Sequence, residues 1–106
     1  MDVVTLLQEG RDQLVEYGLA KEMLVNWNTG AHCAVGTIAY EGRAARRISP
    51  GIYNTVMHYL HCEANGDIVR FNNRRETTLN DVLDVFDRAI LKAKEETARI
   101  TVDRGR

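Results

Sequence analysis

The sequence lacks the features that usually mark a membrane protein or a secreted protein. It has no run of about 18 apolar residues that could form a transmembrane helix. Its N-terminus has neither the basic flank nor the apolar core of a signal peptide, so we expect no secretion signal. Two cysteines, Cys33 and Cys62, are too few for a disulfide framework. We therefore expect a cytoplasmic protein in a reducing compartment, with no membrane partner.

Proline is also scarce, and the positive and negative charges nearly balance. The single proline, Pro50, suits a helical protein better than one rich in loops. The formal net charge of −1 argues against a protein that coats nucleic acid, although it leaves room for a local basic patch. The 106 residues, of which 44% are hydrophobic and 27% charged, have the composition of one globular domain.

Motifs of known catalytic sites are missing as well. Gly30, Gly36 and Gly42 are spaced by six residues and match no phosphate-binding fingerprint. The sequence contains no Cys-x-x-Cys pair, and no paired-carboxylate signature stands out. We therefore expect that the protein is not an enzyme and carries no cofactor.

The clearest helix in the sequence runs from Thr78 to about Ala98. Its apolar residues recur at spacings of three and four and fall within an arc of roughly 120°, the width of a core-facing stripe. The stripe consists of Leu79, Val82, Leu83, Phe86, Ala89, Ile90, Ala93 and Thr97. Thr78 is a candidate N-cap, and Asp81 approximates the second half of a capping box. Val85 and Leu91 lie off the stripe, so they are candidates for a contact with a partner or a second subunit.

Three further helices are expected upstream of this one. The first covers residues 2–17, with Gly18 as its left-handed stop. The small residues of 31–40 favour a buried central helix, although a buried strand would fit them too. Ser49, followed by proline, starts a third helix that reaches about His61.

An irregular segment is expected between the first two helices, over residues 19–30. Met23, Leu24 and Trp27 are expected to tuck under the helices there. We interpret Trp27 as a residue that covers the core, with a platform for a ligand or a partner as the alternative.

The expected fold is mainly α, a compact four-helix domain with a short extended segment before the last helix. The extended segment is residues 67–71, where polar and apolar residues alternate. We assign the domain to residues 1–98 and expect a frayed basic tail over 99–106.

Three short motifs resemble a known family. They are Glu16-Tyr17-Gly18, Cys33-Ala34-Val35-Gly36-Thr37-Ile38 and Phe71-Asn72-Asn73, the last just before the capped final helix. Together they resemble an uncharacterised family of small helical domains, found in actinobacteria and their phages and without an assigned activity. The family pattern has tryptophan where this sequence has Leu19 and Phe71, and aspartate where it has Asn73. The resemblance implies the helical fold and an actinobacterial or phage source, and it transfers no catalytic residue.

The histidines and cysteines fall in two clusters. One contains His32 and Cys33, and the other contains His58, His61 and Cys62. His58 and Cys62 are four residues apart on a predicted helix and can face the same way. His32, His58, His61 and Cys62 are our candidate zinc ligands, and a thiol nucleophile assisted by histidine is a further possibility. The structural alternative is a buried inert thiol at Cys33 and surface histidines near a helix C-terminus.

Two loops rich in arginine are the candidate phosphate-binding site. Their arginines are Arg43, Arg46 and Arg47 in the first loop, and Arg70, Arg74 and Arg75 in the second. If the loops meet, six guanidinium groups would form a patch that suits nucleic acid or a nucleotide. The alternative is that both loops are solvated and balanced by nearby carboxylates.

We expect the protein to be a small non-enzymatic binding protein. The hypothesis is that it is phage-encoded, works in the host cytoplasm, and docks on a host protein or on itself as a dimer. Its partner-interface candidates are Val85, Leu91 and Trp27. The first alternative is binding of nucleic acid or a nucleotide by the arginine loops, and the second is a small zinc-binding or thiol-dependent protein.

Overall fold

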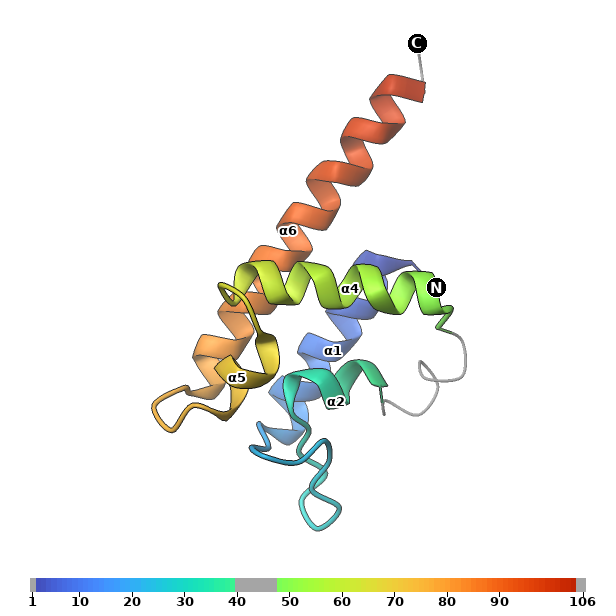
Figure 1. The fold of residues 1–106 in the computed structure, drawn as a ribbon. Coiled ribbons are helices and arrows are strands. Elements are labelled where there is room, and N and C mark those ends of the chain that lie inside the picture. The colour runs from blue at the N-terminus through green and yellow to red at the C-terminus, as the bar shows by residue number, and fades with distance from the viewer. Residues whose placement is uncertain (1, 40–47, 105–106) are drawn as a thin grey trace.

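The structure, a computed structural model, describes residues 2–39 and 48–104 and has five helices over those residues. They are α1 (Val3–Tyr17), α2 (Ala34–Ala39), α4 (Pro50–Glu63), α5 (Ile68–Asn73) and α6 (Leu79–Arg104). Figure 1 shows the long helices α1, α4 and α6 packed across one another, with the short α2 and α5 toward one end. The mainly α fold is confirmed.

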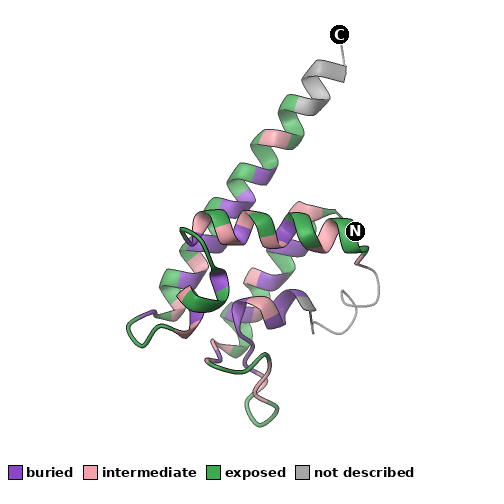
Figure 2. Ribbon diagram, viewed as in Figure 1, coloured by how far each residue is buried: buried purple, intermediate pink, exposed green. Residues whose placement is uncertain are grey.

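The core lies where α6 packs against α1 and α4, and buried side chains of α2 and α5 extend it (Figure 2). Its fully buried members include Leu6, Leu7, Leu14, Val56, Leu60, Val82, Val85, Phe86 and Ala89. Each fully buried valine, leucine or phenylalanine among them contributes about 1.5–3 kcal/mol to the free energy of unfolding. Because α6 contacts two helices, its buried face is wider than the predicted stripe and includes Val85, which is 0% exposed. The prediction that Val85 lies off the core and can contact a partner is therefore wrong.

The long helices begin at the capping residues that the sequence indicates. The carboxylate of Asp2 accepts a bond from the backbone N–H three residues later at 2.8 Å, and the hydroxyl of Ser49 does the same at 3.2 Å. Thr78 and Asp81 form a reciprocal box, since each side chain accepts from the backbone N–H of the other, at 3.2 and 2.9 Å. Each such cap contributes roughly 1 kcal/mol. Gly18 ends α1 with φ 89° and ψ −179°, so the chain leaves α1 extended, not in the left-handed helical conformation.

Residues 31–40 contain a helix, the first of the two interpretations that their sequence allows. The helix is confirmed over Ala34–Ala39, and Tyr40 lies outside the described residues. Before the helix the backbone is extended, because His32 forms isolated β-bridges with Leu19 and Val25.

Residues 68–73 form the short helix α5, so the prediction of an extended segment there is wrong. Asp67 caps this helix by accepting N–H bonds from its first turn, the shorter one from Val69 at 2.9 Å. Ile68 and Asn72 are both buried, and a spacing of four residues places them on one face of a helix. A five-residue alternation is too short to distinguish a strand from such a helix.

The last helix continues through Arg104, so the predicted end at Ala98 and the frayed tail are wrong as far as residue 104. Residues 105–106 lie outside the described part of the chain. Once a helix is formed, adding β-branched residues costs only a few tenths of a kcal/mol each. Figures 1 and 2 show this end of α6 extending beyond α4, with the surface of residues 94–99 largely exposed.

Candidate functional site

Residues 18–33, which we name the α1–α2 connection, fold back on themselves at the end of the molecule opposite the C-terminus (Figure 1). Backbone bonds hold the two sides together, from Ala20 N–H to His32 O at 2.9 Å and from Asn26 N–H to Ala31 O at 2.8 Å. The irregular segment that the sequence predicts is confirmed, and these bonds give it a defined path.

Two asparagines at the end of α5 fasten the α1–α2 connection. Asn72 Oδ1 accepts from Ala34 N–H at 2.9 Å, and Asn72 Nδ2 donates to Ala20 O at 3.0 Å. Asn73 Oδ1 accepts from Glu22 N–H at 2.8 Å. Asn72 is 1% exposed, so removing its amide would leave buried backbone groups without partners. Sequence reasoning noted the asparagines as part of a motif and missed this role.

Gly36 permits a close approach between the α1–α2 connection and α2. A Cβ atom built at this position would lie 2.0 Å from the carbonyl oxygen of Leu24. The same oxygen accepts from Cys33 N–H at 3.0 Å, which fixes its position. Any residue other than glycine would therefore displace the backbone of the connection.

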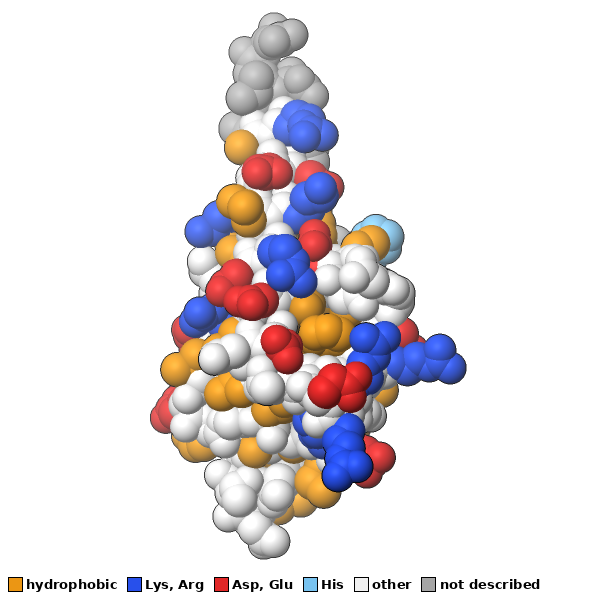
Figure 3. All heavy atoms as spheres, turned by 90° about the vertical axis from the view of Figure 1, so that its left-hand side faces the viewer, with side chains coloured by type: hydrophobic (Ala, Val, Ile, Leu, Met, Phe, Trp, Pro, Cys, Tyr) orange, Lys and Arg blue, Asp and Glu red, His pale blue; other side chains and the backbone are white. Residues whose placement is uncertain are grey.

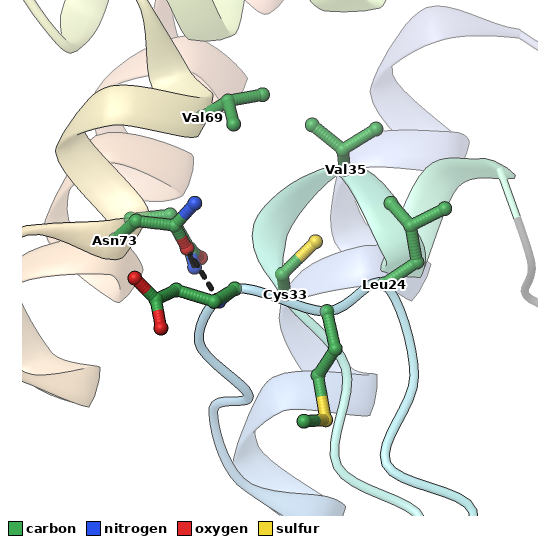
Figure 4. A pocket seen from close by; sticks show the side chains of 8 residues that line it. Leu24, Cys33, Val35, Val69 and Asn73 are labelled. Carbon is green, nitrogen blue, oxygen red and sulfur yellow. Dashed lines mark hydrogen bonds between the residues drawn. The ribbon is translucent and has the colours of Figure 1, made fainter.

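A cleft of about 390 Å³ lies between the α1–α2 connection, α2 and α5. Its apolar lining consists of Met23, Leu24, Val35 and Val69. Figure 4 shows Val69 of α5 on one side and Val35 and Leu24 on the other, with the sulfur of Cys33 between them. Met23, Leu24 and Val69 are 49%, 41% and 44% exposed, which is high for such side chains gathered around one cleft.

Several of the polar groups around the cleft are bonded within the chain. Asn72 and Asn73 hold the α1–α2 connection, and the Cys33 sulfur accepts from Gly36 N–H at 3.2 Å. Among the described residues, no buried side-chain nitrogen or oxygen lacks a hydrogen-bond partner. Glu22 contributes an exposed carboxylate at the rim. The cleft thus offers apolar surface and few unused hydrogen-bonding groups.

The exposed side chains of the α1–α2 connection correct one prediction. Trp27 is 83% exposed, so the interpretation that it covers the core is wrong, and Met23 and Leu24 do not tuck under the helices. The backbone path is set by hydrogen bonds to residues 31–33 and to Asn73, and these bonds leave the three side chains outside. Leu91 is 59% exposed on α6. Trp27 and Leu91 have the accessibility that a partner contact requires, and their role in one stays a prediction.

The four candidate zinc ligands do not converge. His32 Nδ1 lies 2.8 Å from Gly30 O, and His61 Nδ1 accepts from Ile68 N–H at 3.1 Å. His58 and Cys62 do face each other. Within residues 2–39 and 48–104, no group of three or more His, Cys, Asp or Glu side chains could hold a metal ion. The predicted zinc site is therefore wrong, and Cys33 is a buried thiol as the structural alternative predicts.

Half of the candidate phosphate site can be placed. Arg43, Arg46 and Arg47 lie outside the described residues. Arg70, Arg74 and Arg75 are exposed, and Lys21 Nζ donates to the backbone carbonyls of Arg74 and Arg75. On the face shown in Figure 3, basic side chains are interspersed with acidic ones. That the two arginine loops meet stays a prediction.

Residues 1–92 match the model of a family of unknown function, DUF6197. The chain belongs to this family. Membership of an uncharacterised family, which the three motifs indicate, is thereby confirmed, and DUF6197 membership assigns no activity. No curated protein and no solved structure matches the chain.

The DUF6197 match covers the whole cleft and the asparagines that frame it. It ends at Lys92, so the part of α6 that extends beyond α4 follows the matched region. None of the described helices combines the length and apolar character needed to cross a membrane.

Proposed function

We propose that the protein is a non-enzymatic binding module that receives an apolar side chain of a partner protein in the cleft. The observation that carries the proposal is that the cleft has an apolar lining and that hydrogen bonds and close packing fix the backbone around it. Met23, Leu24 and Val69 remain about half exposed, while Asn72 and Gly36 fix the walls on which they stand. Covering such side chains contributes about 25 cal/mol for each Å² of apolar surface removed from water.

The lining favours a protein partner over a small polar ligand. Pockets for small molecules combine apolar walls with a few polar groups that orient the ligand. Here the side chains of Asn72 and Asn73 are bonded to the backbone of the α1–α2 connection, so they support the frame. An inserted apolar side chain needs no such orienting groups.

Trp27 supplies a second contact on the same connection. Tryptophan is enriched among the residues that dominate binding energies at protein interfaces. We also propose that the chain is phage-encoded, that it acts in the host cytoplasm and that the partner is a host protein. This part of the proposal is supported by the resemblance carried by residues 16–18, 33–38 and 71–73. Self-association through the cleft is an outcome that the test below separates.

The test measures binding to a defined partner with matched variants. A protein captured from an actinobacterial lysate is identified by mass spectrometry, purified, and titrated against the wild type, Val69→Asp, Trp27→Ala and Leu91→Ser. We expect Val69→Asp to raise Kd at least tenfold, because it places a charge in the apolar lining. This change corresponds to a loss of about 1.4 kcal/mol of binding free energy. Trp27→Ala should weaken binding as well. Leu91→Ser removes an α6 side chain that is 59% exposed and lies outside the cleft, so under this proposal it should leave Kd unchanged.

Three results would contradict the proposal. The first is Val69→Asp binding as tightly as the wild type. The second is that only the Leu91→Ser variant loses binding to the partner, which would place the interface on α6. The third is a protein that captures no partner and stays monomeric at high concentration in analytical ultracentrifugation. A concentration-dependent dimer that Val69→Asp abolishes would assign the cleft to a second copy of the chain.

The second candidate function is binding of nucleic acid or a nucleotide. Lys21 favours it, because its bonds to the Arg74 and Arg75 carbonyls bring a cation to the backbone of two residues whose side chains are exposed and basic. Fluorescence anisotropy with a labelled single-stranded oligonucleotide and with a labelled nucleotide should then show binding that weakens with salt. The double variant Arg74→Ala/Arg75→Ala should weaken it further. Absence of binding at low salt would exclude this function.

A further inference from the structure

A second hollow, of about 220 Å³, lies between α4 and α6 and shares no residue with the cleft. Its lining includes Thr55, His58, Tyr59, Cys62, Lys92 and Glu96. Cys62 is exposed, and its Sγ lies 3.6 Å from Nε2 of His58, a hydrogen-bond distance for sulfur. The spacing of four residues on α4 brings the two side chains together. The hollow thus contains an accessible thiol next to a group that can take its proton.

The charges around Cys62 come from both helices. On α4, His58 can accept the thiol proton and leave a thiolate beside an imidazolium, whereas Glu63 and the C-terminal end of the helix oppose the thiolate. On α6, Lys92 favours the thiolate and Glu96 opposes it. Arg88 of α6 pairs with Glu63 at 3.5 Å and offsets its charge.

Tyr59 also faces Glu96 and donates its phenolic hydrogen to that carboxylate. Burial, followed by this bond, raises the pKa of Tyr59 to about 12. The phenol therefore stays protonated at neutral pH and occupies one oxygen of Glu96, which leaves the other oxygen for a second donor.

The α6 wall of the hollow presents one cation and one anion. Lys92 and Glu96 are four residues apart on the same helix and both line the hollow. An amino acid carries the complementary pair, an α-carboxylate and an α-ammonium group. A zwitterionic thiol bound to Cys62 would place these groups toward Lys92 and Glu96.

We propose that Cys62 is a thiol-exchange site that takes up a small amino-acid thiol from the corresponding disulfide. The Cys62 thiolate attacks one sulfur of the disulfide, a new S–S bond forms, and the S–S bond of the reagent breaks. The departing thiolate takes up the proton that His58 received. The sulfur of Cys62 is oxidised and the departing sulfur is reduced, so the small disulfide is the oxidant and the electrons balance.

The first part of the test uses cystine with the reduced full chain and follows adducts by intact-protein mass spectrometry. We expect one half-cystine per chain, located at Cys62 and absent in Cys62→Ser. Cys33 serves as an internal control, because it is buried and its sulfur accepts from Gly36 N–H. His58→Gln should slow the reaction at neutral pH about tenfold or more and change the pH dependence of its rate. An equal rate in His58→Gln, or an adduct formed first at Cys33, would overturn the proposal.

The second part tests the ligand class. Lys92→Gln should slow the reaction with cystine and leave the reaction with uncharged 2-hydroxyethyl disulfide unchanged. Lys94→Gln changes an exposed lysine of the same helix that does not line the hollow, and it should affect neither rate. If Lys92→Gln slows both reagents equally, or if Lys94→Gln has the same effect as Lys92→Gln, the preference for amino-acid thiols is overturned. Circular dichroism of each variant checks that these surface changes leave the fold intact.

Discussion

The α1–α4–α6 core and the cleft region are held together by different interactions. In the core, apolar side chains such as Phe86, Leu60 and Leu14 are buried completely where three long helices cross. In the cleft region, the α1–α2 connection is held by the amide of Asn72, the carbonyl group of Asn73 and the close approach at Gly36. The first region uses its apolar side chains for stability, whereas the second leaves several of them accessible.

This difference explains how a small domain can present an apolar cleft in a defined shape. Burial of apolar surface is non-directional, so it stabilises a core without fixing the position of a loop. Hydrogen bonds require particular distances and angles, so Asn72 and Asn73 fix the backbone of the connection directly. The side chains of Met23 and Leu24 are thereby free of a structural role and can serve recognition.

The largest effect is expected from Phe86→Ala, which tests the core. Phe86 is fully buried on α6 and lies close to Gly10 of α1, where a built Cβ would come within 3.0 Å of its ring. Removing the ring should lower the free energy of unfolding by about 3–5 kcal/mol. Urea denaturation measures the loss, and hydrogen exchange should show it in all the long helices together. A loss confined to α6 would contradict a shared core.

The next effect, from Asn72→Ala, tests the frame of the cleft. The substitution leaves the Ala34 N–H and the Ala20 carbonyl without their partner, at an expected cost of about 1–3 kcal/mol for each buried group left unsatisfied. Hydrogen exchange should accelerate at Ala34 more than at amides in the middle of α6. Asn80→Ala, at an exposed asparagine of α6, is the matched control and should change little. Equal acceleration in both regions would mean that the cleft has no separate frame.

The same contrast explains what could be predicted from the sequence. Helix starts depend on residues three positions apart, so the caps at Asp2, Ser49 and Thr78 could be predicted. The burial of Val85 depends on a second helix contacting α6, and the exposure of Trp27 depends on where the α1–α2 connection runs. Both are consequences of contacts between distant residues, which a local pattern does not contain.

The cleft itself illustrates this limit most clearly. Its frame joins Asn72 to Ala34 and Ala20, which are 38 and 52 positions away in the sequence. The one local signal is the asparagine pair before the last helix, since asparagine side chains readily bond backbone groups. The pairing of His58 with Cys62 was predictable because it spans a single helical turn.

A smaller effect is expected from Gly36→Ala, which tests the close approach of the connection to α2. The new methyl group would overlap the Leu24 carbonyl, and overpacking of this kind costs roughly 1–3 kcal/mol. The Cys33 amide, which donates to that carbonyl, should exchange faster. Gly51→Ala is the control, because a Cβ there meets nothing nearer than Ser49 Oγ at 4.0 Å. The control should stabilise the protein by up to about 1 kcal/mol, since alanine loses less backbone freedom on folding.

The smallest effect is expected from acid, because the carboxylate caps of α1 and α6 titrate, whereas the asparagine amides that hold the α1–α2 connection do not. Backbone N–H bonds lower the pKa of Asp2 and of Asp81 below the ordinary value of 3.8. A carboxylate whose pKa is lower in the folded state stabilises the fold above its unfolded pKa, and that contribution is lost as the pH falls through the folded pKa. These two caps belong to α1 and α6, whereas the Asn72 and Asn73 amides that frame the cleft do not titrate.

Acidification from pH 5 to below the ordinary aspartate pKa of 3.8 should therefore loosen the first turns of α1 and α6 before the α1–α2 connection. Urea midpoints and hydrogen exchange across this pH range measure the order of events. Asp81→Asn keeps an oxygen acceptor for Thr78 N–H but cannot titrate, so it should remove the share of the pH dependence that comes from α6. The amide of Glu22, bonded to Asn73, should keep its protection until the core unfolds. If that amide loses protection first, the capping carboxylates of α1 and α6 stabilise the cleft region as well, and the two regions form a single cooperative unit.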